Sequence, residues 1–586
     1  MKIKGLLIGM LACTALVGCT SDDVLENGSV DNGGNKKFAI NIGLNYVSDG
    51  QNSRGAHQGT FNDGSEAEYD VKKTWFIFYD NSKVCLGVTN DVEWEKPDAA
   101  TTDNITRKGT VQFTSYTKPV YAAVLVNGTE EIAEEYAATG KAFNLLNVSK
   151  KHALADVTGG TNGFFMTNST HLHNSEIIDI VKLDVKSISE VEDNGNVTYP
   201  ETATDIYVER VTAKVTLDFS ETLKKQEVTE GDAKYYVLDS KNQQTPKLAV
   251  TIKGWALNGT NNSYYPIKQI ANDWKLTGWY DNTNHRSYWA KDTNYGTGNY
   301  LEASELKNLT LEDGATDTGD KYDLKYITLA SNNFGAIGTT NPQYCYENTM
   351  DKSSLSNLSS VTHVVIKAQY MHYDETSQKA TTLATNENVY RIGQAVWTED
   401  ALKNDVVGYL QNNNYIVKST TEGAAAITWT AAEIAAVKDA VTFTIGMSNE
   451  STPIVTKINL KDYTMTAQGS ETATDNLVEK FDQIDAYEGG YCSYTIPIKH
   501  FAKDGTSDEA SKHVAASEEG YWGVVRNHWY QLVVTDIAAF GEPESAKPII
   551  PEDNKLMTFA INCNINVVAY SVVSQETSVG NGTEWD

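Results

Sequence analysis

The sequence predicts an all-β fold of antiparallel β-sandwiches with a few short helices. Three observations support this prediction. Short segments rich in Val, Ile, Thr and Tyr alternate apolar and polar residues, clusters of Asn, Gly, Asp and Ser separate them, and helical periodicity is rare. Many short strands with few helices are typical of sandwiches rather than of alternating strand–helix units.

The length and the composition allow several folded domains. The chain has 586 residues, of which 40% are hydrophobic and 21% charged, which is enough apolar material for real cores. The formal net charge of −29 repels a phosphate backbone, so we expect no nucleic-acid partner. The same charge opposes electrostatic attachment to an anionic membrane.

The first residues have the pattern of an export signal. Two lysines precede the short apolar stretch Gly5–Val17. The segment Leu16–Cys19 then matches the lipobox of bacterial lipoproteins, in which the thiol of the cysteine is acylated. We therefore expect residues 1–18 to be a lipoprotein signal peptide and Cys19 to carry the lipid, with acyl chains that give a stable membrane anchor.

Alternating segments and helical segments follow along the chain. The expected strands are Phe38–Tyr46, Thr74–Tyr79, Val120–Val126, Arg210–Phe219, Leu248–Trp255, Thr362–Tyr370, Tyr491–Ile498, His528–Ile537 and Thr558–Val573. The expected helices are Glu130–Leu146, Thr398–Leu410 with Thr398 as N-cap, and Thr430–Ala440.

A loop-like stretch over residues 223–242 divides the strands into two groups. We expect a tether and a removable strand over 19–54, an N-terminal sandwich over 55–235, a C-terminal sandwich over 236–542, and a spacer with a final strand over 543–586. The C-terminal half is the longer one, and we expect its extra length to lie in polar insertions such as Tyr280–Asp323.

The first strand is followed by a loop that a protease can cut. One face of this strand carries the apolar side chains Phe38, Ile40, Ile42, Leu44 and Tyr46. The polar stretch after it contains one basic residue, Arg54, followed by Gly55, and a trypsin-like protease cuts such loops. A cut there would release both the strand and the lipid anchor. On composition alone, an ordinary surface arginine is the favoured interpretation of Arg54.

The last strand follows a stiff spacer. Residues 543–554 are rich in proline, which favours an extended conformation. The alternating apolar positions after it are Phe559, Ile561, Cys563, Ile565 and Val567. If the first strand leaves, this strand of a neighbouring copy can fill the vacated groove by β-strand addition, and repeated head-to-tail contacts build a filament. The alternative is that both strands pair within one molecule.

The search for chemistry finds no enzyme signature. The sequence has no nucleophile elbow, phosphate-binding loop, zinc-protease motif or dinucleotide fingerprint, so we expect no catalysis and no cofactor. His171 and His173 lack an obvious third ligand and are expected in a solvated loop, and Glu312–Asp320 lacks the EF-hand spacing. We therefore expect no metal site.

Four cysteines remain beyond Cys19. Cys85, Cys345, Cys492 and Cys563 are widely spaced and form no pair typical of a zinc or redox site. Buried core thiols are the simplest interpretation, and a disulfide within the C-terminal half stays open.

Several segments together resemble a known family. Besides Cys19 and the strand before Arg54, these segments are Val208–Val215, Val364–Tyr370, Tyr494–Phe501 and Gly523–Tyr530 (GVVRNHWY), the last followed by Ile537, Gly541 and the proline-rich spacer. The chain is similar to the fimbrillin-type lipoproteins of the Bacteroidales, most closely to the Mfa1-like shaft subunits of minor fimbriae.

The resemblance implies a fold and an assembly route. It implies two transthyretin-like β-sandwich domains and a lipoprotein precursor at the cell outer membrane. An Arg-specific protease cuts at Arg54–Gly55, and subunits polymerise by donor-strand exchange into an extracellular fimbrium. The donor strand would include Tyr570, where close relatives carry tryptophan.

The implied role is a pilus shaft subunit that supports adhesion. Its partners would be further copies of itself in a head-to-tail polymer, the anchor and tip subunits, the processing protease, and the outer membrane through the lipid. A tip or anchor subunit of the same fimbria remains an alternative. A surface glycan-binding lipoprotein, suggested by 32 Tyr and 11 Trp, is a further one.

Overall fold

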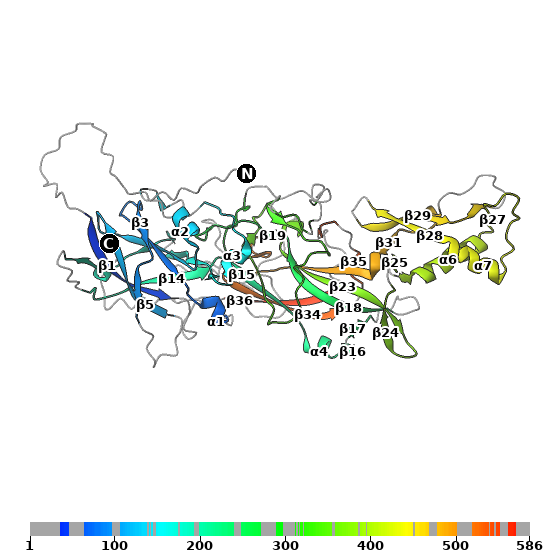
Figure 1. The fold of residues 1–586 in the computed structure, drawn as a ribbon, viewed down its shortest axis with the longest axis horizontal. Coiled ribbons are helices and arrows are strands. Elements are labelled where there is room, and N and C mark those ends of the chain that lie inside the picture. The colour runs from blue at the N-terminus through cyan, green and yellow to red at the C-terminus, as the bar shows by residue number, and fades with distance from the viewer. Residues whose placement is uncertain are drawn as a thin grey trace, which may run out of the picture.

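The computed structural model describes most of the chain between Asn35 and Ala569. The described residues are 35–45, 64–95, 106–136, 140, 142–143, 148–173, 176–192, 199–231, 233–238, 248–270, 289–296, 311, 315, 317–319, 322–353, 358–384, 387–393, 395–448, 452–467, 477–500, 518–537, 540–543, 547–550 and 561–569. They form an elongated molecule with the first strands towards one end and the yellow segment around residues 390–486 at the other (Figure 1).

The N-terminal lobe is built on a ten-stranded sheet. Its strand order is β3-β2-β6-β9-β14-β1-β5-β4, with β12 paired to β6 and β13 paired to β1. The bounds are β1 Lys36–Asn45, β2 Thr74–Tyr79, β3 Cys85–Thr89, β4 Val92–Trp94, β5 Thr106–Ser115, β6 Tyr121–Val126, β9 Met166–Asn168, β12 Val181–Lys182, β13 Ile188–Val191 and β14 Thr204–Arg210.

One hydrophobic core joins the two ends of this sheet. Apolar side chains of β1 and β5 pack with those of β2 and β6, so the sheet closes on itself as a sandwich. The opposite faces of β2 and β6 carry a second cluster that includes side chains of α2 (Glu130–Tyr136). These central strands are buried at nearly every position, so they supply side chains to a core on each face.

The C-terminal lobe is a sandwich of two sheets. The smaller has the order β21-β15-β34-β36 and the larger β16-β17-β18-β23-β32-β35, with β24 paired to β23. The bounds are β15 Ala213–Phe219, β16 Val228–Glu230, β17 Ala233–Val237, β18 Leu248–Asn258, β21 Gln343–Cys345, β23 His363–Asp374, β24 Lys379–Thr382, β32 Tyr491–Pro497, β34 His528–Ile537, β35 Glu542–Pro543 and β36 Ile561–Ala569. Leu217 and Leu532 of one sheet share a core with Trp255 and Ile366 of the other.

A third unit projects from the C-terminal lobe. Its five-stranded sheet has the order β26-β25-β31-β29-β28, it also contains the β27–β30 pair and two helices, and it has its own core. The bounds are β25 Val389–Ile392, β26 Ala395–Thr398, α6 Glu399–Asn412, β27 Ile416–Ser419, α7 Ala431–Ala440, β28 Val441–Met447, β29 Pro453–Leu460, β30 Tyr463–Thr466 and β31 Ile484–Tyr487. The sequence did not single this unit out. It accounts for much of the extra length that we expected in polar insertions.

Short elements complete the described chain. They are α1 Glu66–Tyr69, α3 Leu154–Val157, β7 Thr158–Gly159, β8 Gly163–Phe164, β10 His171–His173, β11 Glu176–Ile178, α4 Glu221–Lys224, β19 Thr260–Asn261, β20 Leu324–Lys325, β22 Asn348–Thr349, β33 Gly523–Val524, and the 3₁₀ turns Val185–Ser187, Leu358–Ser360, Val478–Lys480 and Glu488–Gly490.

The predicted all-β sandwich fold is confirmed, with three differences in detail. The sandwiches are not wholly antiparallel, because β1 pairs with β14 and β15 pairs with β34 in parallel. Both parallel pairs join strands far apart in the chain, which leaves room for the long crossover that parallel pairing needs. The predicted helix Glu130–Leu146 ends at Tyr136, and Ala142 forms a β-bridge with Val84 instead.

The third difference is the predicted strand Arg210–Phe219, which is two strands. The strand β14 ends at Arg210 in the N-terminal sheet, and β15 begins at Ala213 in the C-terminal sheet. The chain therefore passes between the lobes at residues 211–212, upstream of the boundary that we expected at residue 235.

Candidate functional site

The strand β1 lies inside its sheet with a neighbour on each edge. It pairs with β5 in antiparallel fashion over all ten of its residues. On its other edge, residues 37–40 pair with β13 and residues 42–45 pair with β14. We call the space between β5 and the β13–β14 edge the β1 slot.

The sequence of β1 explains how deeply it is buried. Phe38 is 2% exposed, and Ile40, Ile42 and Leu44 are fully buried in the core of the lobe. The alternation that the sequence predicted therefore points one face into the core. Burial of four such side chains stabilises the lobe by roughly 6–12 kcal/mol, at about 1.5–3 kcal/mol each.

The other face of β1 is also specifically contacted. Ala39 is fully buried. The carboxamide of Asn41 accepts a hydrogen bond from the Thr110 hydroxyl (2.8 Å) and donates one to the carbonyl of Pro200 (3.1 Å). Gly43 lies against Asp205, and a Cβ added at Gly43 would come within 2.3 Å of an Asp205 carboxylate oxygen. The residues around the slot therefore make specific contacts with both faces of the strand that fills it.

The C-terminal strand β36 has a different position. All nine of its residues pair with β34 in antiparallel fashion, with one register shift between Val534 and Asp536. It lies at the end of the order β21-β15-β34-β36, so among the strands that the structure describes it is paired on one edge. In this structure the C-terminal strand is thus an edge strand of its own chain. Unpaired edges of this kind are open to strand addition.

Charged side chains are buried where the two lobes meet. Glu68 of α1 is 1% exposed and forms an ion pair with Lys214 of β15 (2.9 Å). The Tyr344 hydroxyl donates to the second carboxylate oxygen of Glu68 (2.9 Å), and the Arg210 Nε donates to its carbonyl (2.8 Å). These contacts tie α1, the first described helix after β1, to the C-terminal lobe.

The pKa of Glu68 reflects this environment. Burial alone would raise the pKa of its carboxyl, but hydrogen bonds from the Ser65 backbone and from Lys214, with the positive charge of Arg210, lower it to about 2. Glu68 therefore stays ionised, and its buried charge is compensated.

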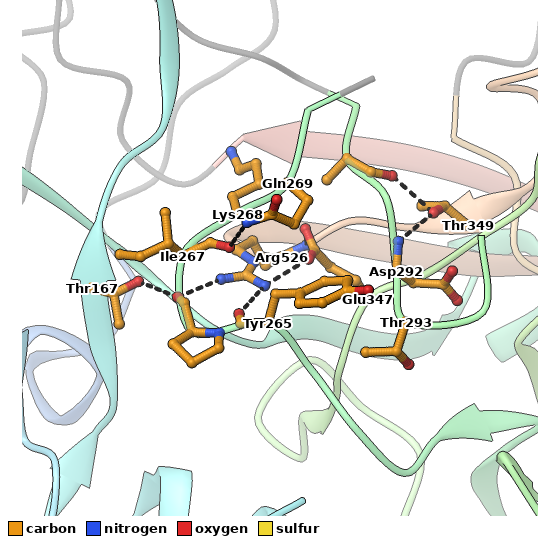
Figure 2. Close-up of polar contacts among 12 residues, drawn as sticks. Thr167, Tyr265, Ile267, Lys268, Gln269, Asp292, Thr293, Glu347, Thr349 and Arg526 are labelled. Carbon is orange, nitrogen blue, oxygen red and sulfur yellow. Dashed lines mark hydrogen bonds and ion pairs between the residues drawn. The ribbon is translucent and has the colours of Figure 1, made fainter. Parts of the chain in front are cut away.

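A second group of buried charges surrounds Arg526 (Figure 2). Its guanidinium is fully buried, pairs with Glu347 (2.7 Å), and donates to the carbonyls of Tyr265 (2.6 Å) and Pro266 (3.0 Å). The Thr167 hydroxyl of β9 donates to the same Pro266 carbonyl (2.6 Å). A planar guanidinium suits such multiple recognition. Arg526 belongs to the GVVRNHWY segment of the sequence, whose structural role the sequence did not reveal.

A third buried ion pair lies beside this group. Lys268 and Glu209 of β14 are 2.7 Å apart and almost completely buried. Breaking a buried pair by removing one partner typically costs about 3–5 kcal/mol. The Glu68–Lys214 and Lys268–Glu209 pairs therefore fasten the N-terminal lobe to the C-terminal lobe, whereas Arg526 and Glu347 both belong to the C-terminal lobe.

The predicted site residues fall into three groups. Phe38, Ile40, Ile42 and Leu44 lie together on the buried face of β1. The backbones of Ile561, Cys563, Ile565 and Val567 lie in β36. Cys19, Tyr46, Arg54, Gly55, Phe559 and Tyr570 lie outside the described residues.

The other candidate groups are the histidine pair and the cysteines. His171 and His173, expected in a solvated loop, lie in β10, which pairs with β11. Within the described ranges, no three His, Cys, Asp or Glu side chains are arranged to hold a metal ion. Cys85, Cys345 and Cys492 are buried, and burial raises the pKa of the Cys345 thiol to about 12. Among the helices that the structure describes, none is long and apolar enough to span a membrane.

Comparison with known proteins places the C-terminal part of the chain in a family. Residues 485–576 match the family described as major fimbrial subunit protein type IV, fimbrillin, C-terminal. This part of the chain is of the fimbrillin type. The matched segment begins in β31 and contains β32, β34 and β36, so the fimbrillin-type part includes the edge strand described above.

Solved structures similar to this chain have low identity. A candidate cell adhesion protein from Parabacteroides distasonis is 13% identical, with 92% of this chain and 100% of that chain covered and a TM-score of 0.37. A fimbrilin from Porphyromonas gingivalis is 11% identical, with 92% and 99% covered and a TM-score of 0.33.

The tip fimbrial protein Mfa3 from Porphyromonas gingivalis is 9% identical, with 91% and 100% covered and a TM-score of 0.29. We draw no conclusion from similarities at these scores. A search of curated protein sequences found no match.

Proposed function

We propose that this chain is a structural subunit of a surface fimbrium that assembles by donor-strand exchange. It is exported as a lipoprotein acylated at Cys19, cut between Arg54 and Gly55, and polymerised when the C-terminal strand of one copy replaces β1 of the next. The observation that carries the proposal is the interior position of β1, combined with the fimbrillin-type match that extends to β36.

The position of the cut supports this proposal. The strand β1 ends at Asn45 and α1 begins at Glu66, so a cut after Arg54 separates the two. Glu68 of α1 is held to Lys214 and Tyr344 of the C-terminal lobe. The new N-terminus therefore begins close to an anchored helix, and the rest of the lobe keeps its covalent and ionic ties.

Energetics favour replacement of β1 over its simple loss. Loss without a substitute would expose the apolar slot and leave backbone groups of β5, β13 and β14 unpaired. A strand that enters from another copy restores both. It also gains a second paired edge, which β36 lacks beside β34, and each net backbone hydrogen bond contributes about 0.5–1.5 kcal/mol.

The partners follow from this route. Each copy contacts two further copies head to tail, and such heterologous contacts extend without closing. The anchor and tip subunits end the filament, an Arg-specific protease releases β1, and the lipid holds the precursor at the outer membrane. The mature location is the extracellular fimbrium.

Substitution of Arg54 tests the proposal. We expect Arg54→Ala to leave an uncut, lipid-anchored precursor and no filament ladders on gels of surface material. Arg54→Lys separates the protease classes, because a trypsin-like enzyme accepts lysine and an Arg-specific one does not. Normal ladders from Arg54→Ala would contradict the proposal. The N-terminal sequence of wild-type surface material should begin at Gly55.

A further inference from the structure

The C-terminal strand repeats the sequence of β1. Residues 38–47 read FAINIGLNYV and residues 559–568 read FAINCNINVV. The six identical positions are Phe38/Phe559, Ala39/Ala560, Ile40/Ile561, Asn41/Asn562, Asn45/Asn566 and Val47/Val568. Three of the other four pairs are apolar on both sides, and Gly43/Asn564 is the exception.

From this repeat we infer that the donor strand enters the β1 slot in one register, Phe559 at the place of Phe38, and that Asn564 then contacts Asp205. The inference rests on the proposed function and adds the register and a recognition contact to it. The occupant is a second copy of this chain, because the slot already accepts a strand with this sequence.

The buried face of the slot fits this register. Phe559, Ile561, Cys563 and Ile565 take the places of Phe38, Ile40, Ile42 and Leu44, all of which are buried. Phe38 stands opposite Phe113 of β5, so the phenyl ring of Phe559 regains an aromatic neighbour. The alternation of apolar residues alone would accept a slip of two residues, so the other face must decide the register.

The second face excludes a slip of two residues in either direction. A slip one way places Asn562 where Ala39 is fully buried, and a buried carboxamide without partners is costly. A slip the other way places Ala560 where Asn41 bonds Thr110 and Pro200, and it leaves both groups without that partner. The first slip would still put an asparagine, Asn564, between Thr110 and Pro200, so the buried place of Ala39 is what excludes it. The second slip puts alanine there.

Asn564 is the position where the donor differs from β1. A Cβ at the place of Gly43 would lie 2.3 Å from an Asp205 carboxylate oxygen, so that carboxylate must turn aside. The Asp205 side chain is exposed and the close atom is at its end, so the carboxylate rather than the backbone moves. The Asn564 amide then donates to the carboxylate, a contact that the glycine of β1 lacks.

The C-terminal strand has less backbone pairing beside β34 than it would have in the β1 slot. Beside β34 the C-terminal strand has one paired edge, whereas in the slot it would have β5 on one edge and β13 with β14 on the other. Exchange therefore adds backbone pairing as well as the contacts of both faces.

Engineered disulfides between copies test the register in the full chain. Thr110→Cys is combined with Asn562→Cys, and Cys563→Val removes the native thiol next to it. The protein is cut after Arg54 and assembled under oxidised glutathione. We expect covalent ladders on non-reducing gels, because Asn41 and Thr110 are directly opposite each other in the β1–β5 pair.

The matched controls carry the second cysteine at Asn564 or at Asn566 instead. Both should assemble into filaments without covalent ladders. Filaments that are cross-linked only by a control pair, or by none of the three pairs, overturn the register while the proposed function stands. Cut protein that stays monomeric in all variants overturns donor-strand exchange itself, and the register with it.

A double-mutant cycle tests the Asn564 contact. Assembly of cut protein is followed by light scattering. We expect Asn564→Ala to slow assembly about three- to tenfold in the presence of Asp205 and to have no further effect in an Asp205→Ala background. An Asn564→Ala effect of the same size in both backgrounds, or no effect in either, overturns the contact.

Discussion

The strands β1 and β36 belong to similar sequence segments and have very different surroundings. β1 lies between β5 and the β13–β14 edge and buries a full apolar face in the core of its lobe. β36 lies at the edge of its sheet beside β34 alone. Sequence alone therefore does not set how strongly a strand is held. Its position in the sheet does.

The largest test of this comparison is removal of each strand in turn. Deletion of residues 36–45 should cost roughly 6–12 kcal/mol of unfolding free energy, because four buried apolar side chains are lost with it. Truncation after Asn554 should give a folded monomer that loses a smaller share of its stability. Thermal and chemical unfolding of the purified variants measures both. Equal losses would show that the two strands are held alike.

A smaller loss of unfolding free energy is expected when the buried Glu68–Lys214 ion pair between the lobes is broken. Glu68→Gln should cost about 3–5 kcal/mol, because it leaves the buried charge of Lys214 without its partner. The matched control is Glu190→Gln at the exposed Lys36–Glu190 pair, which should cost about 0–1 kcal/mol. Urea unfolding at neutral pH compares the two substitutions.

The same pair predicts a pH dependence. The pKa of Glu68 is lowered from 4.5 to about 2 in the folded chain, so its stabilisation is complete above pH 4.5 and is lost as the pH falls towards 2. Glu68→Gln should lack this component. A variant with the same acid dependence as the wild type between pH 4.5 and 2 would contradict the assignment.

The smallest expected effect on stability distinguishes the two related segments, residues 38–47 and 559–568. Asn41→Ala should destabilise the uncut precursor by about 1–2 kcal/mol, because the Thr110 hydroxyl and the Pro200 carbonyl lose a partner. Asn562→Ala should leave the stability of the precursor nearly unchanged and slow its assembly after cleavage. Unfolding and light scattering measure the two properties. A reversal of this pattern would mean that the slot does not recognise the asparagine of the donor.

The sequence predicts the local structure well where the patterns are strong. The strands β2 and β34 have the predicted bounds, and β1 differs only at its ends. Thr398 caps α6 as expected, and its hydroxyl accepts from the Ala401 amide (3.2 Å). Alternation and capping are properties of neighbouring residues, so they can be read from a short stretch of sequence.

Long-range pairing could not be predicted in the same way. Glu68 and Lys214 are 146 residues apart in the chain, and each looks like an ordinary surface charge in its own segment. The buried Arg526 lies in a segment that the sequence singled out, but its partners come from distant loops. The third unit was missed because its strands pair across two intervening helices.

The most direct test of donor-strand exchange is a structure of the filament itself at side-chain resolution. We predict that the slot between β5 and β14 contains residues 559–568 of the neighbouring copy, with Phe559 opposite Phe113, and that residues 36–45 are absent. A filament in which residues 36–45 still fill the slot, while residues 561–569 stay beside β34 of their own chain, would contradict it.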